Sequence, residues 1–147
     1  MKKLAIMAIA CTLMASCGKC DAPILFPEKD FQTTVDGKEV SIYTLKGGDI
    51  TMQVTNFGAR VVSLWTPDKD GKYDDIVLGY NNIDNYINNP GERFLGAVVG
   101  PYANRIANGT YTIGEEVYNF PQDDNGQTLH GGLKGLDMVV WDVKEVS

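Results

Sequence analysis

The sequence has few of the residues from which metal and disulfide sites are built. Its 147 residues include one His and three Cys, and all three Cys lie within residues 1–20. A structural zinc site needs about four such ligands, and a disulfide framework needs paired cysteines spread through the domain. The sequence therefore predicts no metal site and no disulfide scaffold.

Positive charge is also scarce. Thirteen Lys and Arg stand against nineteen Asp and Glu, which gives a formal net charge of −6. Nucleic acids and anionic lipid surfaces attract proteins that display clusters of positive charge, so non-specific binding to either is disfavoured. We therefore expect no nucleic-acid partner.

The chain does contain enough apolar material for a folded domain. Hydrophobic residues make up 44% and charged residues 22% of the sequence. These proportions are typical of globular proteins and exclude disorder as the main state. A length of 147 residues fits one domain, or part of one.

The N-terminus has the pattern of an export signal. Lys2 and Lys3 precede an apolar run over residues 4–14, which is shorter than the about 20 residues that a membrane-spanning helix requires. Basic residues followed by a short apolar run indicate a secretory signal peptide. We assign this signal peptide to residues 1–16.

Residues 14–17, Met-Ala-Ser-Cys, resemble a bacterial lipobox. The resemblance implies cleavage before Cys17, which then carries lipid, and so predicts an exported lipoprotein anchored on the periplasmic or cell-surface side of a membrane. The alternative is an ordinary cleaved signal peptide in which Cys17 is incidental. Residues 17–30 are expected to form a tether, and residues 31–147 the folded domain.

From residue 31 onward the chain consists of short alternating runs separated by turn residues. Asp36-Gly37 and Gly114-Glu115 are pairs that favour tight hairpin turns. No segment keeps a helical period long enough for a crossover helix. The pattern therefore predicts an all-β fold, an antiparallel sandwich or barrel.

Several segments carry more specific expectations. Ile50, Met52 and Val54 alternate with polar residues, which predicts a strand whose apolar face is buried. The two tryptophans are expected in the core. Further strands are expected at 60–66, 75–80 and 138–146, and a loop at 81–90; the tryptophans are Trp65 and Trp141.

Two loop-like segments carry the polar residues of a candidate site. Asn104 and Arg105 stand side by side within residues 100–109, and together they offer the acceptor and donors that would grip neighbouring hydroxyls. His130 precedes two glycines, and its imidazole could bind a sugar oxygen or serve as acid or base. The alternatives are a surface ion pair for Arg105 and a structural turn role for His130.

The sequence motifs in these segments resemble those of a known family. NFGARVVSL at 56–64, GPYANRIANGTYTI at 100–113, and LHGG at 129–132 followed by Gly135 and Trp141 are together similar to the N-terminal part of aldose 1-epimerases, also called galactose mutarotases. The resemblance extends over residues 40–147. It implies an antiparallel β-sandwich of the galactose-mutarotase type, of which this chain holds the N-terminal portion.

The resemblance also implies an activity. Family members are isomerases that interconvert the α and β anomers of free hexoses such as galactose and glucose without a cofactor. A base takes the proton of the anomeric hydroxyl and an acid protonates the ring oxygen, so that the ring opens and recloses. By resemblance, Asn104 and Arg105 bind sugar hydroxyls, and His130 contacts the substrate near the reacting centre.

The family's general acid, a second His, and its general base, a Glu, are expected beyond Ser147, in a chain that is truncated here. The resemblance also shows one local departure, because family members commonly carry Asn where this chain has Asp123-Asp124. The main alternative is a non-catalytic carbohydrate-binding surface lipoprotein that uses the same three residues. An epimerase of phosphorylated sugars is disfavoured by the export signal, and an unfolded remnant would show exposed strand edges.

Overall fold

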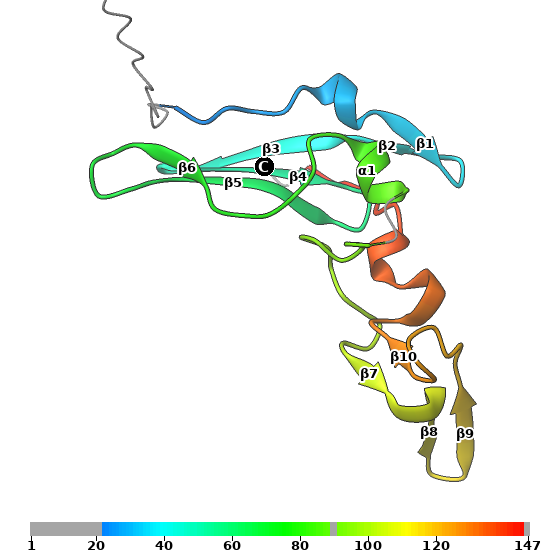
Figure 1. Cartoon of the computed structure of the whole chain (residues 1–147). Helices are drawn as coiled ribbons and strands as arrows, with labels where there is room; N and C mark the ends of the chain where they lie inside the picture. The colour runs from blue at the N-terminus through cyan, green and yellow to red at the C-terminus, as the bar shows by residue number, and fades with distance from the viewer. Residues whose placement is uncertain (1–21, 89–90, 146–147) are drawn as a thin grey trace, which may run out of the picture.

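The structure, a computed structural model, describes residues 22–88 and 91–145. The predicted signal peptide and Cys17 lie outside the described residues. Figure 1 shows an elongated molecule with a four-stranded sheet at one end and an arm that ends in a hairpin at the other. Every pairing between the described strands is antiparallel, which confirms the all-β expectation.

The strands are β1 (Thr33–Val35), β2 (Lys38–Val40), β3 (Ile42–Gly47), β4 (Ile50–Thr55), β5 (Arg60–Pro67), β6 (Tyr73–Asp75), β7 (Arg105–Ile106), β8 (Thr110–Ile113), β9 (Glu116–Asn119) and β10 (Thr128–Leu129). The helical segments are α1 (Ile83–Ile87) and four 3-10 turns, η1 (Glu28–Phe31), η2 (Ala107–Gly109), η3 (Gly132–Lys134) and η4 (Leu136–Met138). The described strands form the sheet β3-β4-β5-β6 and three two-stranded sheets, β1-β2, β8-β9 and β7-β10.

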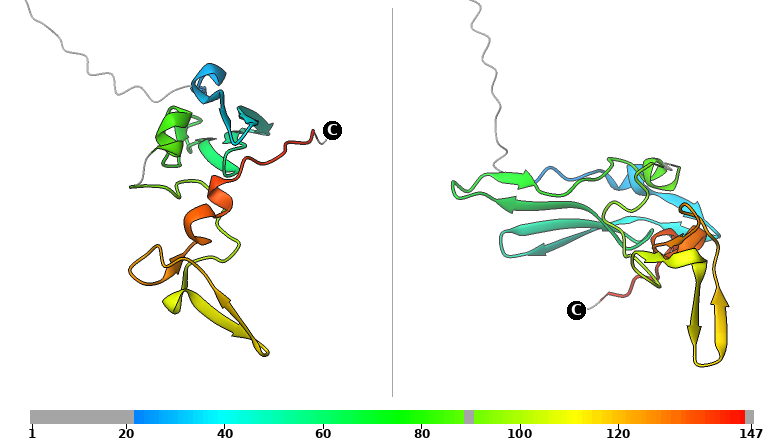
Figure 2. Two further views of the ribbon diagram at one scale, coloured as in Figure 1. Left: turned by 90° about the vertical axis from the view of Figure 1, so that its right-hand side faces the viewer. Right: turned by 60° about the horizontal axis from the view of Figure 1, so that its bottom comes forward.

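Both predicted hairpins are confirmed. Asp36 and Gly37 have φ values of 50° and 77°, and they join β1 to β2 in a tight turn of the kind that needs positive φ. Gly114, with φ of 62°, joins β8 to β9. The second hairpin projects from the far end of the arm (Figure 2).

The buried face of β4 is the opposite of the one predicted. Thr51, Gln53 and Thr55 are buried, whereas Ile50 is 47% exposed. The polar face is covered because the N-terminal segment runs across it. The Gln53 side chain binds both polar groups of the Phe26 backbone, accepting from its N–H at 2.9 Å and donating to its carbonyl at 3.1 Å.

The folded part therefore begins before residue 31, within the segment expected to be a tether. Phe26 packs against the core, and its ring lies 6.0 Å from that of Phe31. Phe31 is fully buried and forms the end of η1. The core cluster consists of Phe31, Val40, Ile42, Phe57, Val62, Ile83, Tyr86 and Val140.

The loop expected at 81–90 contains a short helix. Asn82 caps α1 by accepting a hydrogen bond from the Asn85 N–H at 3.0 Å, as an N-terminal cap does. Tyr86, on the buried side of this helix, accepts a hydrogen bond from the Tyr80 N–H at 2.8 Å. Tertiary packing of Tyr86 thus stabilises a helical turn that the asparagine-rich sequence disfavours.

Two strand predictions were wrong. β6 ends at Asp75, where the expected strand 75–80 begins, because the Asp75 carboxylate accepts from the Leu64 N–H at 2.9 Å and the Val77 N–H at 3.2 Å. Residues 138–145 form an isolated bridge between Phe57 and Val140, and Lys38 of β2 binds the Val140 carbonyl and the Asp142 carboxylate, but no strand is formed there.

Neither tryptophan belongs to the core cluster, which corrects the expectation made for both. Trp65 is half-buried, and Trp141 is 37% exposed. The Trp141 indole N–H donates to the Leu136 carbonyl at 3.3 Å. Within residues 22–88 and 91–145, no helix is long and apolar enough to cross a membrane.

Candidate functional site

The two loop segments singled out in the sequence lie side by side in the arm. β7 pairs with β10 so that Arg105 stands opposite Leu129 and Ile106 opposite Thr128. Further along, the Leu136 N–H donates to the Gly100 carbonyl at 2.9 Å. These backbone contacts bring Asn104, Arg105 and His130 together, although up to 26 residues separate them in the chain.

Asn104 and His130 are joined by two hydrogen bonds. The Asn104 N–H donates to Nδ1 of His130 at 2.9 Å, and the His130 N–H donates to the Asn104 carbonyl at 3.0 Å. Because Nδ1 is an acceptor, the neutral imidazole carries its proton on Nε2. The site therefore presents an imidazole N–H donor of defined position.

Both residues adopt the left-handed backbone region, with φ of 66° at Asn104 and 51° at His130. Non-glycine residues visit this region rarely, and such positions are frequent at functional sites. The reciprocal hydrogen bonds hold both turns in this conformation.

Arg105 makes the surface ion pair that was the alternative interpretation of this residue. Its Nε lies 2.6 Å from Oδ2 of Asp124, with side-chain exposures of 47% and 20%. Its Nη1 also donates to Oδ1 of Asn104 at 3.2 Å. The ion pair thus orients the guanidinium within the site, beside the Asn104 amide.

The glycine after His130 is required by close packing. Gly131 has φ of 95°, and a Cβ atom there would collide with the carbonyl oxygen of Gly100. Only glycine combines this φ with so close an approach. The small residues of the LHGG segment therefore bring the two loops together.

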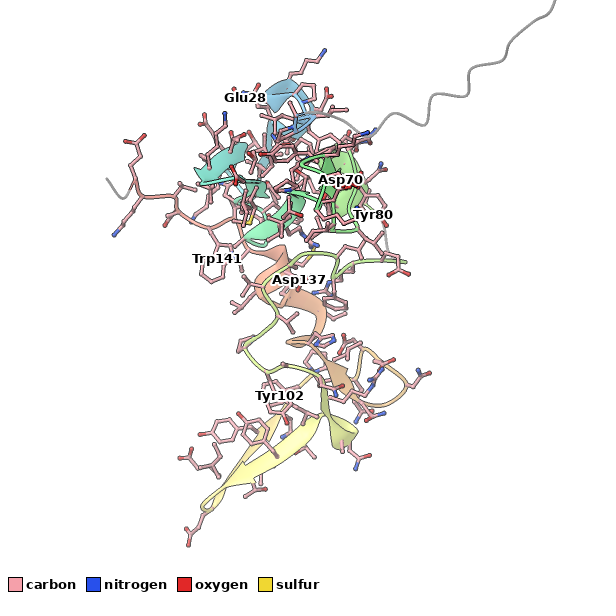
Figure 3. All side chains as sticks on the ribbon, turned by 90° about the vertical axis from the view of Figure 1, so that its left-hand side faces the viewer. Glu28, Asp70, Tyr80, Tyr102, Asp137 and Trp141 are labelled. Carbon is pink, nitrogen blue, oxygen red and sulfur yellow. The ribbon has the colours of Figure 1, made fainter. Side chains whose placement is uncertain are left out.

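A buried ionic cluster lies where the arm joins the sheet (Figure 3). Asp137, which is fully buried, accepts two hydrogen bonds from Arg93, from Nε at 2.6 Å and from Nη2 at 2.9 Å. This two-bond geometry is the strong form of an arginine–carboxylate pair. It ties the segment before β7 to the segment after β10.

Arg60 completes the cluster from β5. Its Nη2 donates to the Asp137 carbonyl at 3.0 Å, and its Nη1 donates to the Arg93 carbonyl at 2.7 Å. Arg60 has no exposed surface. Burial lowers the pKa of the Arg60 guanidinium, and the Asp137 carboxylate opposes this shift.

Phe94 connects the ionic cluster to the candidate site, because its ring contacts both Arg93 and His130. The Arg93 guanidinium carbon lies 4.9 Å from the centre of the Phe94 ring, and this ring meets the His130 imidazole edge to face with centroids 4.8 Å apart. Sequence reasoning missed Arg93, Phe94 and Asp137. The available signal was a charged residue, Asp137, between the apolar residues 136 and 138.

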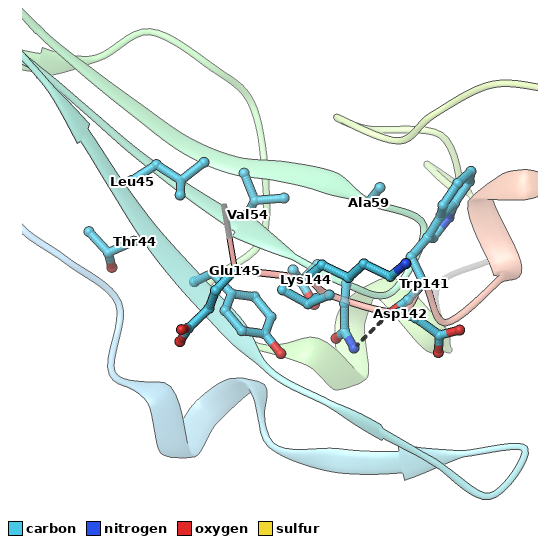
Figure 4. Close-up of a pocket in the computed structure, with 12 residues that line it drawn as sticks. Thr44, Leu45, Val54, Ala59, Trp141, Asp142, Lys144 and Glu145 are labelled. Atoms are coloured by element: carbon cyan, nitrogen blue, oxygen red, sulfur yellow. Dashed lines mark hydrogen bonds between the residues drawn. The ribbon is translucent and has the colours of Figure 1, made fainter. Parts of the chain in front are cut away.

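A separate cavity of about 790 Å³ lies between the sheet and the C-terminal segment (Figure 4). It is lined on the sheet side by Tyr43, Leu45 and Val54, and on the other side by Trp141 and Lys144. None of Asn104, Arg105 and His130 lines it. In the described part of the chain, no three His, Cys, Asp or Glu side chains are grouped to hold a metal ion.

Comparison with known proteins identifies the family. A model of the aldose 1-epimerase family matches residues 41–147, which is most of the chain and includes all three candidate residues. The match indicates a family of isomerases, and the antiparallel strands described above agree with it. The chain belongs to the aldose 1-epimerase family.

Individual relatives agree with this assignment. A probable aldose 1-epimerase of Arthroderma benhamiae is 38% identical over 112 residues, a match that covers 74% of this chain and 26% of the relative. A galactose mutarotase of Mus musculus is 35% identical over 105 residues, covering 71% and 30%. The chain thus spans about a quarter to a third of the length of these relatives.

Solved structures show the same correspondence. An aldose epimerase homologue from C. elegans superposes with a TM-score of 0.66 at 32% identity, covering 74% of this chain and 33% of that one. A galactose 1-epimerase from Lactobacillus acidophilus gives 0.61 at 31% identity, covering 75% and 31%. The fold described here corresponds to part of the mutarotase fold.

Proposed function

We propose that this chain carries the hexose-binding part of an aldose 1-epimerase, whose reaction interconverts the α and β anomers of free hexoses such as galactose and glucose. The observation that carries the proposal is the contact of Asn104 with both His130 and Arg105. An amide, a guanidinium and an imidazole in mutual contact suit the recognition of neighbouring hydroxyls. The names of the relatives support the same substrate class.

The chemistry assigned to this chain is binding and orientation. Ring opening needs a base at the anomeric hydroxyl and an acid at the ring oxygen. His130 presents Nε2–H as a donor to a sugar oxygen, while Arg105 supplies a fixed positive charge that stabilises negative charge developing on oxygen. No metal or organic cofactor is needed for these steps.

Sugar binding and anomer exchange are tested together by NMR, with galactose as the probe. We expect the chain to bind galactose, and a protein that joins it to the family's general acid and base to accelerate exchange between the two anomeric proton signals. Arg105→Ala should weaken galactose binding by about ten- to a hundredfold, the loss of a charge-assisted hydrogen bond. An unchanged affinity would remove Arg105 from the site. Lys72→Ala, a substitution in the β5–β6 turn, is the matched control and should bind as the parent does.

A second candidate function is carbohydrate binding without proton transfer. It is favoured by the environment of Asp124, whose carboxylate is engaged by both Arg105 and the Asn125 amide. A carboxylate held in this way serves orientation. This candidate predicts the same galactose affinity and the same effect of Arg105→Ala, but an anomer exchange rate equal to that of free sugar.

We further propose that the protein is an exported lipoprotein anchored to a membrane through lipid on Cys17. The support is the sequence of residues 1–17, a short apolar run that ends in a lipobox-like Met-Ala-Ser-Cys. Cys17→Ser should abolish incorporation of labelled fatty acid and move the protein to the soluble fraction. Membrane association that persists in this variant would contradict the anchor.

A further inference from the structure

We propose that Arg93 is a positioning residue for His130, acting through the Phe94 ring and the Gly132 carbonyl. The inference rests on the proposed function, in which His130 presents its Nε2–H to a sugar. The role assigned to Arg93 is to orient the His130 imidazole in the sugar-free protein.

The Arg93 side chain is fixed by the buried Asp137 carboxylate. Its Nε and Nη2 bind the two carboxylate oxygens of Asp137, and Asp137 is anchored in turn by Arg60, whose Nη2 lies 3.8 Å from Oδ2. A guanidinium held at two nitrogens has one orientation. Arg93 is therefore a rigid part of the structure although its side chain is 21% exposed.

Arg93 contacts the His130 turn in two ways. Its Nη2 donates to the Gly132 carbonyl at 3.0 Å, two residues after His130, and thus fixes the backbone of the turn. Its charge also lies over the Phe94 ring at 4.9 Å, an attractive cation–π arrangement. The Phe94 ring therefore contacts both this guanidinium and the imidazole.

The imidazole is consequently restrained from two sides. The Asn104 N–H binds Nδ1, and the Phe94 ring packs at 62° to the imidazole plane. A half-turn of the imidazole about its Cβ–Cγ bond would break the hydrogen bond at Nδ1, and intermediate angles would also break the contact with Phe94. Because the Asn104 N–H engages Nδ1, Nε2 is the ring nitrogen left to bind a ligand.

His130 is the one histidine of the sequence, so its ring can be observed alone by NMR after selective ¹⁵N and ¹³C labelling. In the sugar-free protein we expect a single tautomer with the proton on Nε2, and carbon-bound ring protons shifted by the Phe94 ring current. These two signals report positioning without any sugar.

Arg93→Gln should give an averaged tautomer signal and a smaller ring-current shift, and should lower galactose affinity by about two- to tenfold, the cost of ordering one side chain. Arg93→Lys keeps a donor for Gly132 without the two-bond fork and should recover part of the effect. Lys134→Gln, in η3, is the charge-matched control and should leave the His130 signals unchanged.

Phe94→Leu covers the case in which Arg93→Gln does not fold, because it leaves the ion pair intact. We expect it to remove the ring-current shift and loosen the tautomer preference. His130 signals unchanged in folded Arg93→Gln, or in Phe94→Leu, would overturn the proposal. Altered signals with no galactose effect would instead contradict the proposed sugar site and leave the positioning role supported.

Discussion

Arg105 and Asp124 form an ion pair across the candidate site, with Nε 2.6 Å from Oδ2. Asp124 belongs to the Asp123-Asp124 pair that the family resemblance marks as an expected departure, and the structure shows which groups this carboxylate contacts. It fixes the guanidinium whose Nη1 binds the Asn104 amide. Asp124 therefore affects the orientation of Arg105, which we propose binds the sugar.

Asp124→Asn is expected to weaken galactose binding while changing the free energy of unfolding only slightly. The pair is partly exposed, so its contribution to the free energy of unfolding is at most about 1 kcal/mol. Freeing the arginine side chain costs about 0.5–1.5 kcal/mol on binding, or about two- to tenfold in affinity. Calorimetric titration measures the change. Tighter binding by the variant would show that the carboxylate competes with sugar.

Asp137→Asn should destabilise the protein strongly. The substitution leaves the guanidinium groups of Arg60 and Arg93 without their carboxylate, and breaking a buried pair in this way costs about 3–5 kcal/mol. Urea unfolding followed by tryptophan fluorescence measures this loss. Asp142→Asn is the matched control, because Asp142 pairs with Lys38 at side-chain exposures of 81% and 52%. Equal stability of the two variants would contradict the structural role of the cluster.

Gly131→Ala should disrupt the site by steric overlap. Its Cβ atom would enter the space of the Gly100 carbonyl, and overpacking of this kind costs about 1–3 kcal/mol beyond the strain of positive φ. Gly114→Ala isolates the backbone strain, because Gly114 has φ of +62° and open space around it. We expect a lower thermal midpoint for Gly131→Ala than for Gly114→Ala. Equal thermal midpoints for the two variants would show that the two loops move apart to accommodate the added Cβ atom.

Stability at alkaline pH should depend on Tyr86. Burial raises the pKa of the Tyr86 hydroxyl above its ordinary value of 10.0, so the folded state keeps a proton that the unfolded state loses above about pH 10. Stability from this group is present below pH 10 and falls as pH rises, by at most about 1.4 kcal/mol per pH unit. Urea unfolding between pH 9 and 11 measures this slope, which should be smaller in Tyr86→Phe. An equal slope in both proteins would contradict it.

The two hairpins and the residues of the candidate site were predicted from residue types that lie close together in the sequence. Asp36-Gly37 and Gly114 satisfy a positive-φ requirement that their turns impose. Asn104, Arg105 and His130 were proposed from their residue types and from the family resemblance, and the structure shows them in contact. Such signals depend on residues adjacent in the chain.

The errors lie where distant segments decide the structure. Alternation alone could not show which face of β4 is buried, because the N-terminal segment bound by Gln53 determines this. Likewise, the link between Arg93 and Asp137 spans 44 residues and has no periodic signature. Long-range polar contacts of this kind are set by the fold as a whole.

We propose that Asn104, Arg105 and His130 form a hexose site. The most direct measurement is a galactose titration of protein labelled with ¹⁵N in the His130 ring, the one histidine of the sequence. We expect a saturable shift of the Nε2 resonance in the parent protein and a much weaker response in Arg105→Ala. An Nε2 resonance that does not move at galactose concentrations up to its solubility limit would contradict it.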